Sequence, residues 1–467
     1  MVVRPCLPLP VSHRGRVTIQ YSDPKVTIVG GGLAGCEAAW QAARGGVPVV
    51  LYDMKPERMS PAHASPDFAE LVCSNSLRAN TLSNAVGLLK QEMRGMSSLI
   101  LAAADATSVP AGRALAVDRT AFSRFITEAI EANPRIEVRR ELVAEIPEEP
   151  ITILATGPLT APELARDLQR LLGEEYLYFY DAISPTVYAD SIDHEVVFRQ
   201  SRYESGEGDY LNVPLSGTEY RAFVASLLAA ETVPLHAFEA ALYFEGCLPV
   251  EELARRGPET LAFGPMKPVG LVDPRTGRRP HAVVQLRQED KAGVLYNLVG
   301  FQTKLRVGEQ KRVVRSLPGL SRAVFARFGS VHRNTYINAP KRLLPTLELR
   351  ARPGLYIAGQ MAGVEGYVES AALGGMAGVN AARAARGRVH QVAPPDTAHG
   401  ALIEHLMNAR AKSFQPMNVN YGLFPALPVL GKKLPKKERN ERIAQRALAS
   451  FNGYLAQIAS EPVGVAR

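Results

Sequence analysis

One glycine-rich turn near the start of this chain constrains its fold more than any other feature. A short apolar run, Val26 to Val29, ends in a turn that contains Gly30, Gly32 and Gly35, and an Ala-rich stretch of helical composition follows. A second apolar run ends at Asp53, about twenty residues beyond the glycines. Strand, glycine turn, helix and strand in this order predict a βαβ unit, from which parallel sheets are built.

The three glycines have separable roles in a dinucleotide site. Gly30 allows a tight turn, Gly32 allows the backbone to approach a pyrophosphate, and Gly35 allows close packing of helix on strand. The free N–H groups and the dipole at the start of the helix favour the phosphate charge. Asp53 ends the next strand, where its carboxylate can accept hydrogen bonds from ribose hydroxyls. These four residues are the predicted cofactor-binding residues of the first segment.

Further elements extend the same sheet. Asp118 to Ala132 has the pattern of a helix, whereas Ile136 to Val143 and Ile151 to Leu154 have the pattern of strands. Between about residues 181 and 330, short strand-like pieces alternate with helices, which predicts an inserted α+β domain. The fold class is therefore α/β, with a Rossmann-like FAD-binding domain of the glutathione-reductase type that is interrupted by an insertion.

A second strand-and-glycine segment decides between the dinucleotides. It contains Gly359 and Gln360, and a Gly- and Ala-rich helix from about Ser370 to Ala385 follows it. A segment of this kind closes over a flavin, and the chain has no second GxGxxG motif for a dedicated nicotinamide domain. We therefore predict FAD as the bound cofactor, with NADH or NADPH as a reductant that reaches the flavin from an open face.

Five segments are expected along the chain. They are a disordered extension (1–24), the first part of the FAD-binding domain (25–180), the inserted α+β domain (181–330), the second part of the FAD-binding domain (331–388) and a basic helical C-terminal segment (389–467). No apolar run approaches the ~20 residues that a membrane-spanning helix needs. We therefore expect no membrane association.

The cysteines indicate a reducing compartment. Cys6, Cys36, Cys73 and Cys247 are widely spaced, without a CxxC pair, and no His cluster has metal-ligand spacing. This pattern argues against a disulfide framework and against a metal site, and it favours the cytoplasm.

Positive charge gathers at the end of the chain. The formal net charge is +8, and residues 389–467 hold ten Lys and Arg against five Asp and Glu. One interpretation is a polyanionic partner. The other is that Lys432, Lys433, Lys436 and Lys437 belong to a solvated surface turn.

Several ordered segments carry a family resemblance. They are Gly30 to Gly35, Leu71 to Ser76, Phe263 to Leu271 and Gly359 to Tyr367. From about Lys25 to at least Tyr421 the chain resembles the folate- and FAD-dependent tRNA (uracil-5-)-methyltransferases of the TrmFO family. The related MnmG (GidA) family of tRNA wobble-uridine enzymes, which shares the fold but is longer, is the second candidate.

The resemblance implies a reaction and its residues. A methylene group from 5,10-methylenetetrahydrofolate is attached to carbon 5 of the T-loop uridine of tRNA and reduced to methyl by FADH2. Carbon 5 becomes nucleophilic when a thiolate adds to carbon 6. Cys73 and Cys247 match the family's active-site cysteines, and Tyr367 helps to enclose the pocket where a pterin stacks on the flavin. One thiol adds to carbon 6 and the other transfers a proton or carries an adduct, an assignment that stays open. Cys6 and Cys36 are expected to be dispensable.

Four other polar residues stay unranked. Asn75, Arg78, Lys267 and Arg287 either hold folate or RNA or serve as structural residues. Three classes of function remain to be compared: an RNA methyltransferase, a small-molecule FAD oxidoreductase, and a nucleic-acid-binding flavoprotein without turnover. The fold alone would favour the second, whereas the resemblance favours the first.

Overall fold

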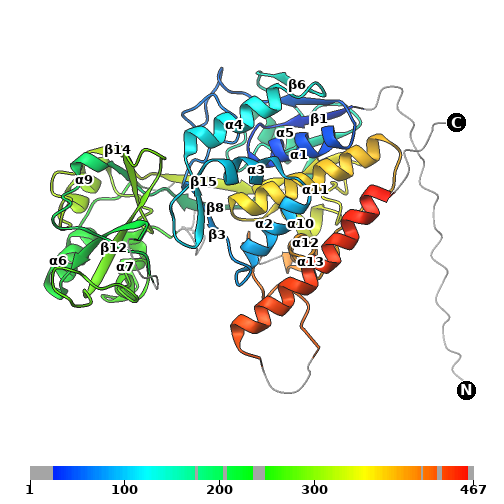
Figure 1. Ribbon diagram of the computed structural model, residues 1–467. Coiled ribbons are helices and arrows are strands. Elements are labelled where there is room, and N and C mark those ends of the chain that lie inside the picture. The colour runs from blue at the N-terminus through cyan, green and yellow to red at the C-terminus, as the bar shows by residue number, and fades with distance from the viewer. Residues whose placement is uncertain are drawn as a thin grey trace, which may run out of the picture.

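The computed structural model describes residues 25–173, 177–202, 208–234, 248–411, 414–428 and 434–460. The predicted extension (1–24), Cys6, Cys247, Lys432 and Lys433 lie outside these residues. Figure 1 shows two units side by side, one with the first strands and one with β12 and α6, and a long helix at the C-terminal end that runs along the first unit.

A five-stranded parallel sheet forms the centre of the first unit. In the order in which they pair, its strands are β16 (Leu355–Ile357), β7 (Thr152–Leu154), β1 (Val26–Val29), β2 (Val49–Tyr52) and β6 (Ile136–Arg139). The predicted βαβ unit is confirmed, and β16 returns the second glycine segment to the same sheet. The strand predicted from Ile136 to Val143 was too long. It ends at Arg139 because its partner β2 ends at Tyr52, so no ladder continues beyond that pair.

Helices cover this sheet and fix the two glycine segments against each other. They are α1 (Leu33–Arg44), α2 (Ala85–Gly95), α3 (Leu99–Ala106), α4 (Arg119–Glu131), α5 (Pro162–Leu172), α10 (Ala339–Arg342) and α11 (Tyr367–Ala385), with a 3-10 turn, η3 (Gly359–Ala362). A Cβ at Gly374 of α11 would lie 2.1 Å from the carbonyl oxygen of Ala34, and one at Gly378 would lie 2.3 Å from that of Ala38. Only glycine permits this close approach of α11 to α1. α11 begins at Tyr367, three residues before its predicted start at about Ser370.

An antiparallel sheet of six strands forms the second unit. In pairing order it contains β10 (Phe198–Arg199), β11 (Tyr210–Leu215), β12 (Ala282–Gln288), β13 (Leu295–Leu298), β9 (Thr186–Tyr188) and β14 (Phe325–Arg327). Its helices are α6 (Gly217–Leu228), α7 (Val250–Arg255), α8 (Thr260–Phe263) and α9 (Val307–Arg315), with a 3-10 turn, η1 (Ala189–Ser191).

The two faces of this sheet differ in polarity. The face that carries Val187, Val213, Val284, Leu286 and Leu298 builds a separate hydrophobic core with the helices. The opposite face carries buried polar side chains, namely those of Thr186, Asn212, Gln285, Arg287 and Asn297. Since side chains alternate along a strand, the polar layer follows from the sequence pattern of each strand.

Smaller elements join these units. The chain passes between them along an antiparallel pair, β8 (Leu177–Ala182) and β15 (Val331–Tyr336), which lies between the two units in Figure 1. A three-stranded sheet contains β3 (Ser76–Ala79), β5 (Ala114–Val117) and β4 (Ser108–Val109).

The C-terminal segment is helical, as predicted. It contains α12 (Ala398–Asn408) and α13 (Lys436–Ser460). Phe451 and Tyr454 of α13 are buried in the core of the first unit. No helix among the described residues is both long and apolar enough to cross a membrane. The predicted domain boundaries remain a proposal.

Candidate functional site

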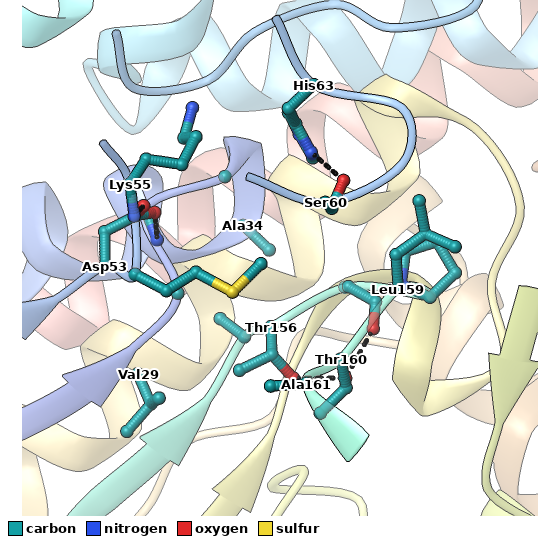
Figure 2. Close-up of a pocket in the computed structure, with 18 of the residues that line it drawn as sticks. Val29, Ala34, Asp53, Lys55, Ser60, His63, Thr156, Leu159, Thr160 and Ala161 are labelled. Carbon is teal, nitrogen blue, oxygen red and sulfur yellow. Dashed lines mark hydrogen bonds between the residues drawn. The ribbon is translucent and has the colours of Figure 1, made fainter. Parts of the chain in front are cut away.

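A cleft opens at the carboxyl ends of the parallel strands, where ligands bind in open α/β sheets. Its empty volume is about 1170 Å³, including the part open to solvent. Both glycine segments contribute to its lining, with Gly30, Gly32, Asp53, Gly359, Gln360 and Tyr367. Figure 2 shows Asp53 and Lys55 on one side of the cleft and Thr156 and Thr160 on another.

The structure shows the turn expected at Gly30 and the close packing expected at Gly35, and it leaves the space beside Gly32 open. Gly30 has a φ of +108°, and a Cβ there would lie 2.6 Å from the carbonyl oxygen of Ala155. A Cβ at Gly35 would lie 1.7 Å from the carbonyl oxygen of Gly30, so this residue is needed for packing. A Cβ at Gly32 would meet no atom within 4 Å. Gly32 therefore faces open space in the cleft at the start of α1.

The start of α1 suits a diphosphate. Gly32 is the N-cap of this helix, no side chain caps it, and its first turn holds no acidic residue. Its N–H groups are therefore available to phosphate oxygens.

Asp53 is held in place by main-chain donors. Its Oδ2 accepts a hydrogen bond from the N–H of Gly31 at 2.7 Å, and its Oδ1 accepts one from the N–H of Lys55 at 2.8 Å. Each carboxylate oxygen has a second lone pair, which leaves capacity for ribose hydroxyls. Together with the glycine cradle, this arrangement fits the adenosine diphosphate part of FAD.

The second glycine segment brings a tyrosine to Cys73. Tyr367 is the first residue of α11, and its hydroxyl donates to the Sγ of Cys73 at 3.0 Å. The same oxygen accepts hydrogen bonds from the N–H groups of Cys73 at 2.8 Å and Ser74 at 3.2 Å. Burial, and then the neighbouring Cys73, raise the pKa of Tyr367 well above its ordinary value. The phenol therefore remains a proton donor to sulfur at neutral pH.

Three buried or half-buried arginines surround the loop that carries Cys73. They are Arg119 of α4, Arg287 of β12 and Arg327 of β14. The first donates to the carbonyl of Leu71 at 2.5 Å, the third to the carbonyl of Val72 at 2.9 Å, and the second to the Oγ of Ser74 at 2.7 Å. Glu289 accepts from Arg119 at 2.6 Å. The loop is thus held by side chains from both units.

Comparison with known proteins identifies the family. The family model described as "Glucose inhibited division protein A" matches residues 25–389. A Geobacter sulfurreducens protein named methylenetetrahydrofolate–tRNA-(uracil-5-)-methyltransferase TrmFO is 61% identical over 434 residues, which cover 93% of this chain and 99% of the relative. A protein of the same name from Desulforudis audaxviator is 59% identical, over 92% of this chain and 98% of the relative. The chain belongs to the TrmFO family.

Solved structures confirm the predicted fold class. Two crystal forms of Aquifex aeolicus GidA match with TM-scores of 0.65 and 0.64 at 17% and 16% identity. They cover 94% and 92% of this chain, and the matches span 74% and 76% of the GidA chains. At such identity the likeness concerns the fold alone, a Rossmann-type FAD-binding fold. The relatives of high identity carry the TrmFO name, so the TrmFO resemblance is confirmed over the MnmG alternative.

The polar residues left unranked in this TrmFO-family chain now have positions. The side chain of Asn75 is fully buried and donates to the carbonyls of Val117 and Gln288. Arg78 pairs with the buried carboxylate of Glu369. These contacts favour structural roles. Lys267 is exposed on the loop that follows α8, and Arg287 contacts the Cys73 loop.

Cys36 has a local structural explanation. It is fully buried on α1, and its Sγ donates to the carbonyl of Gly31 at 3.3 Å. Burial, and then the nearby Asp53, raise the pKa of this thiol far above its ordinary value. A thiol in this state is a small core residue. Its dispensability for methyl transfer remains a prediction.

Sequence reasoning missed Arg119, Arg327 and Glu289. Arg119 belongs to a helix and Arg327 to a strand without a motif, and Glu289 directly follows β12. Their positions beside Cys73 depend on how the two units meet. No motif or spacing in the sequence marks these three residues.

We expect Tyr367→Phe to lower the free energy of unfolding by about 2 kcal/mol, because the N–H groups of Cys73 and Ser74 lose their acceptor. Tyr454→Phe is the control, since that buried hydroxyl contacts the weak acceptor sulfur of Met376 at 3.8 Å. It should cost less than about 1 kcal/mol. Denaturant unfolding followed by flavin fluorescence measures both, and equal costs would contradict the role of Tyr367.

Proposed function

We propose that this chain methylates carbon 5 of the T-loop uridine of tRNA, with 5,10-methylenetetrahydrofolate as carbon donor and reduced FAD as hydride donor. The near full-length identity of 61% to a protein named as a TrmFO methyltransferase carries this proposal. The site supports it, since the glycine cradle, Asp53 and Tyr367, whose hydroxyl contacts Cys73, all line one cleft. NADH or NADPH is the proposed reductant, and the cytoplasm, where tRNA is modified, is the proposed location.

Different residues of the chain have different roles in the proposed reaction. The start of α1 and Asp53 bind the adenosine diphosphate of FAD, which supplies hydride chemistry when bound. Cys73 is the proposed thiol that adds to carbon 6 of uracil or carries the transient adduct, and Cys247, which lies outside the described residues, is its counterpart. Tyr367 orients the thiol of Cys73 through three hydrogen bonds and keeps its own proton.

One experiment separates the competing functions. Purified protein is incubated with tRNA that lacks 5-methyluridine, with methylenetetrahydrofolate labelled in its one-carbon unit, and with NADH or NADPH. Label in 5-methyluridine of the T loop supports the proposal. Label in the wobble uridine would favour the MnmG-like function, and nicotinamide oxidation that needs no RNA would favour a small-molecule oxidoreductase. Comparison of the two nicotinamides identifies the reductant.

The lysines around the start of α13 give a separate prediction. Lys436 and Lys437 are exposed in the first turn of α13, where the helix dipole disfavours positive charge. We expect that replacing Lys432, Lys433, Lys436 and Lys437 together by glutamine lowers the slope of log affinity for tRNA against log salt. Each lost phosphate contact reduces the slope by about 0.7 to 0.9. An unchanged slope would mean that these lysines are solvated and make no contact with the phosphates of tRNA.

A further inference from the structure

A β-bulge directs Arg327 toward the Cys73 loop. β14 is an edge strand whose Phe325 pairs with Val187 and whose Arg327 pairs with Thr186. A step of two residues along β14 thus corresponds to a step of one residue along β9, which leaves one extra residue in β14. The bulge therefore places Phe325 with Val187 on the core face and Arg327 with Thr186 on the polar face. Without it, both side chains would share one face. Bulges at sheet edges commonly re-aim a side chain next to a site.

The positive charges of the arginines around this loop outnumber the negative charge of their acidic neighbour, Glu289. Arg119 and Arg327 both lie near Glu289, whose carboxylate accepts from Arg119 at 2.6 Å but is 4.0 Å from the Nη2 of Arg327. The Nε and Nη2 of Arg327 are buried and have no hydrogen-bond partner among the described residues. Arg287 uses its guanidinium on Ser74 and Asn75. One carboxylate thus faces three guanidinium groups.

Arg327 has donors left for an anion. Buried polar groups in proteins are nearly always hydrogen-bonded, and a guanidinium presents its N–H groups as a fork that matches phosphate oxygens. Its Nη1 donates to the carbonyl of Val72, the residue before Cys73. The guanidinium group therefore lies within about one nucleotide's length of the Cys73 thiol. The side chain as a whole is 34% exposed, compared with 17% for Arg119, but its Nε and Nη2 are covered by protein, so the guanidinium has to turn outward to meet a ligand. Burial, and then the charge of Arg119, lower the pKa of Arg327.

We propose that Arg327 binds a phosphodiester that flanks the target uridine of the substrate RNA and so seats the base beside Cys73. This inference rests on the proposed function and names the contact that positions its RNA. Arg327 is absent from the lining of the flavin cleft, in the part of the chain that the structure describes. Cys73 is absent from that lining as well, whereas its neighbours Val72 and Tyr367 belong to it. A ligand of this arginine can therefore lie beside Cys73 without occupying the space of the flavin.

Charge-changing variants give the first test. Arg327→Gln should weaken tRNA binding roughly ten-fold at low salt and lower the salt slope by about 0.7 to 0.9. Arg327→Lys, which keeps the charge, should retain the slope. Arg315→Gln is the matched control, because Arg315 of α9 also donates to a main-chain carbonyl, that of Ala323, at 2.9 Å. Figure 1 shows α9 at the far end of the second unit from α3 and α4. The control should bind tRNA as wild type does, and all three variants should retain FAD.

Neutral phosphate analogues identify the contact. A T-arm RNA with a methylphosphonate at one of the two phosphates that flank the target uridine should bind wild-type protein as weakly as unmodified RNA binds Arg327→Gln. Combining the two changes should add no further loss. Additive losses at both phosphates would overturn the proposal.

A folate-binding experiment tests whether the anion that Arg327 binds is a carboxylate of folate instead of a phosphate of RNA. Arg327→Gln should leave the affinities for tetrahydrofolate and for its analogue without the glutamate unchanged. If the variant instead makes the two affinities equal, the arginine binds the folate carboxylate, and the RNA assignment is wrong. Failure of the proposed function is separate from both results, since wild-type protein would then transfer no label to tRNA at all.

Discussion

Replacing Cys73 by alanine should reduce methyl transfer to tRNA by roughly 10⁴-fold or more, while the flavin content stays that of wild type. The thiol is partly exposed, it receives a hydrogen bond from Tyr367, and it lies on a loop anchored by three arginines. The alanine variant keeps the main-chain hydrogen bonds from residues 73 and 74 to Tyr367, so the loop retains its anchor. Activity therefore falls because the thiol is missing.

The other cysteines make the comparison specific. Cys36→Ala is the buried control, and it should retain both FAD and activity, because its thiol makes only one weak hydrogen bond, to the carbonyl of Gly31 just before α1. Cys6→Ala should behave in the same way, whereas Cys247→Ala should lose activity. Single-turnover assays of label transfer on the four FAD-loaded variants measure the effects. Full activity in both Cys73→Ala and Cys247→Ala would refute the thiol mechanism, and loss in Cys36→Ala with FAD retained would show that the wrong cysteine had been chosen.

The parts of the fold that could be predicted are those encoded locally. The βαβ unit follows from spacing within thirty or so residues, since strand, glycine turn and helix each have a short-range signal. The return of Gly359 to the same cleft followed from a second signal of the same kind. The length of β6 was overestimated, because a strand ends where its partner ends, and that partner is remote in sequence.

Contacts between distant residues explain what could not be predicted. Tyr367 and Cys73 are 294 positions apart, and only the family resemblance related them. The three arginines around the Cys73 loop come together only where α4, β12 and β14 meet. Arg327 faces that loop only because of a bulge in β14. No composition or periodicity signals a bulge that re-aims one side chain. The polar layer of the antiparallel sheet is visible in the sequence as alternation, but its position against the Cys73 loop is not.

Replacing Gly32 by leucine should yield a folded, colourless protein whose affinity for FAD is lower by roughly 100-fold. The backbone of Gly32 is extended, with φ −78° and ψ −172°, so leucine adopts it without strain. Its side chain would enter open space in the cleft, which is where we place the pyrophosphate. Because no protein atom is displaced, the free energy of unfolding without flavin should stay within about 0.5 kcal/mol of that of wild type.

Two further glycines separate binding from folding. Gly35→Leu drives a side chain into the carbonyl of Gly30, so it should lose the fold of the βαβ unit together with the flavin. Gly308→Leu is the matched control, since a Cβ at this exposed position of α9 also meets no atom within 4 Å, and it should stay yellow. Visible absorbance and circular dichroism of the purified variants report flavin and fold. A yellow Gly32→Leu protein with full FAD content would mean that the pyrophosphate does not approach Gly32. Wild-type stability in Gly35→Leu would show that α1 does not need to pack so closely on β1.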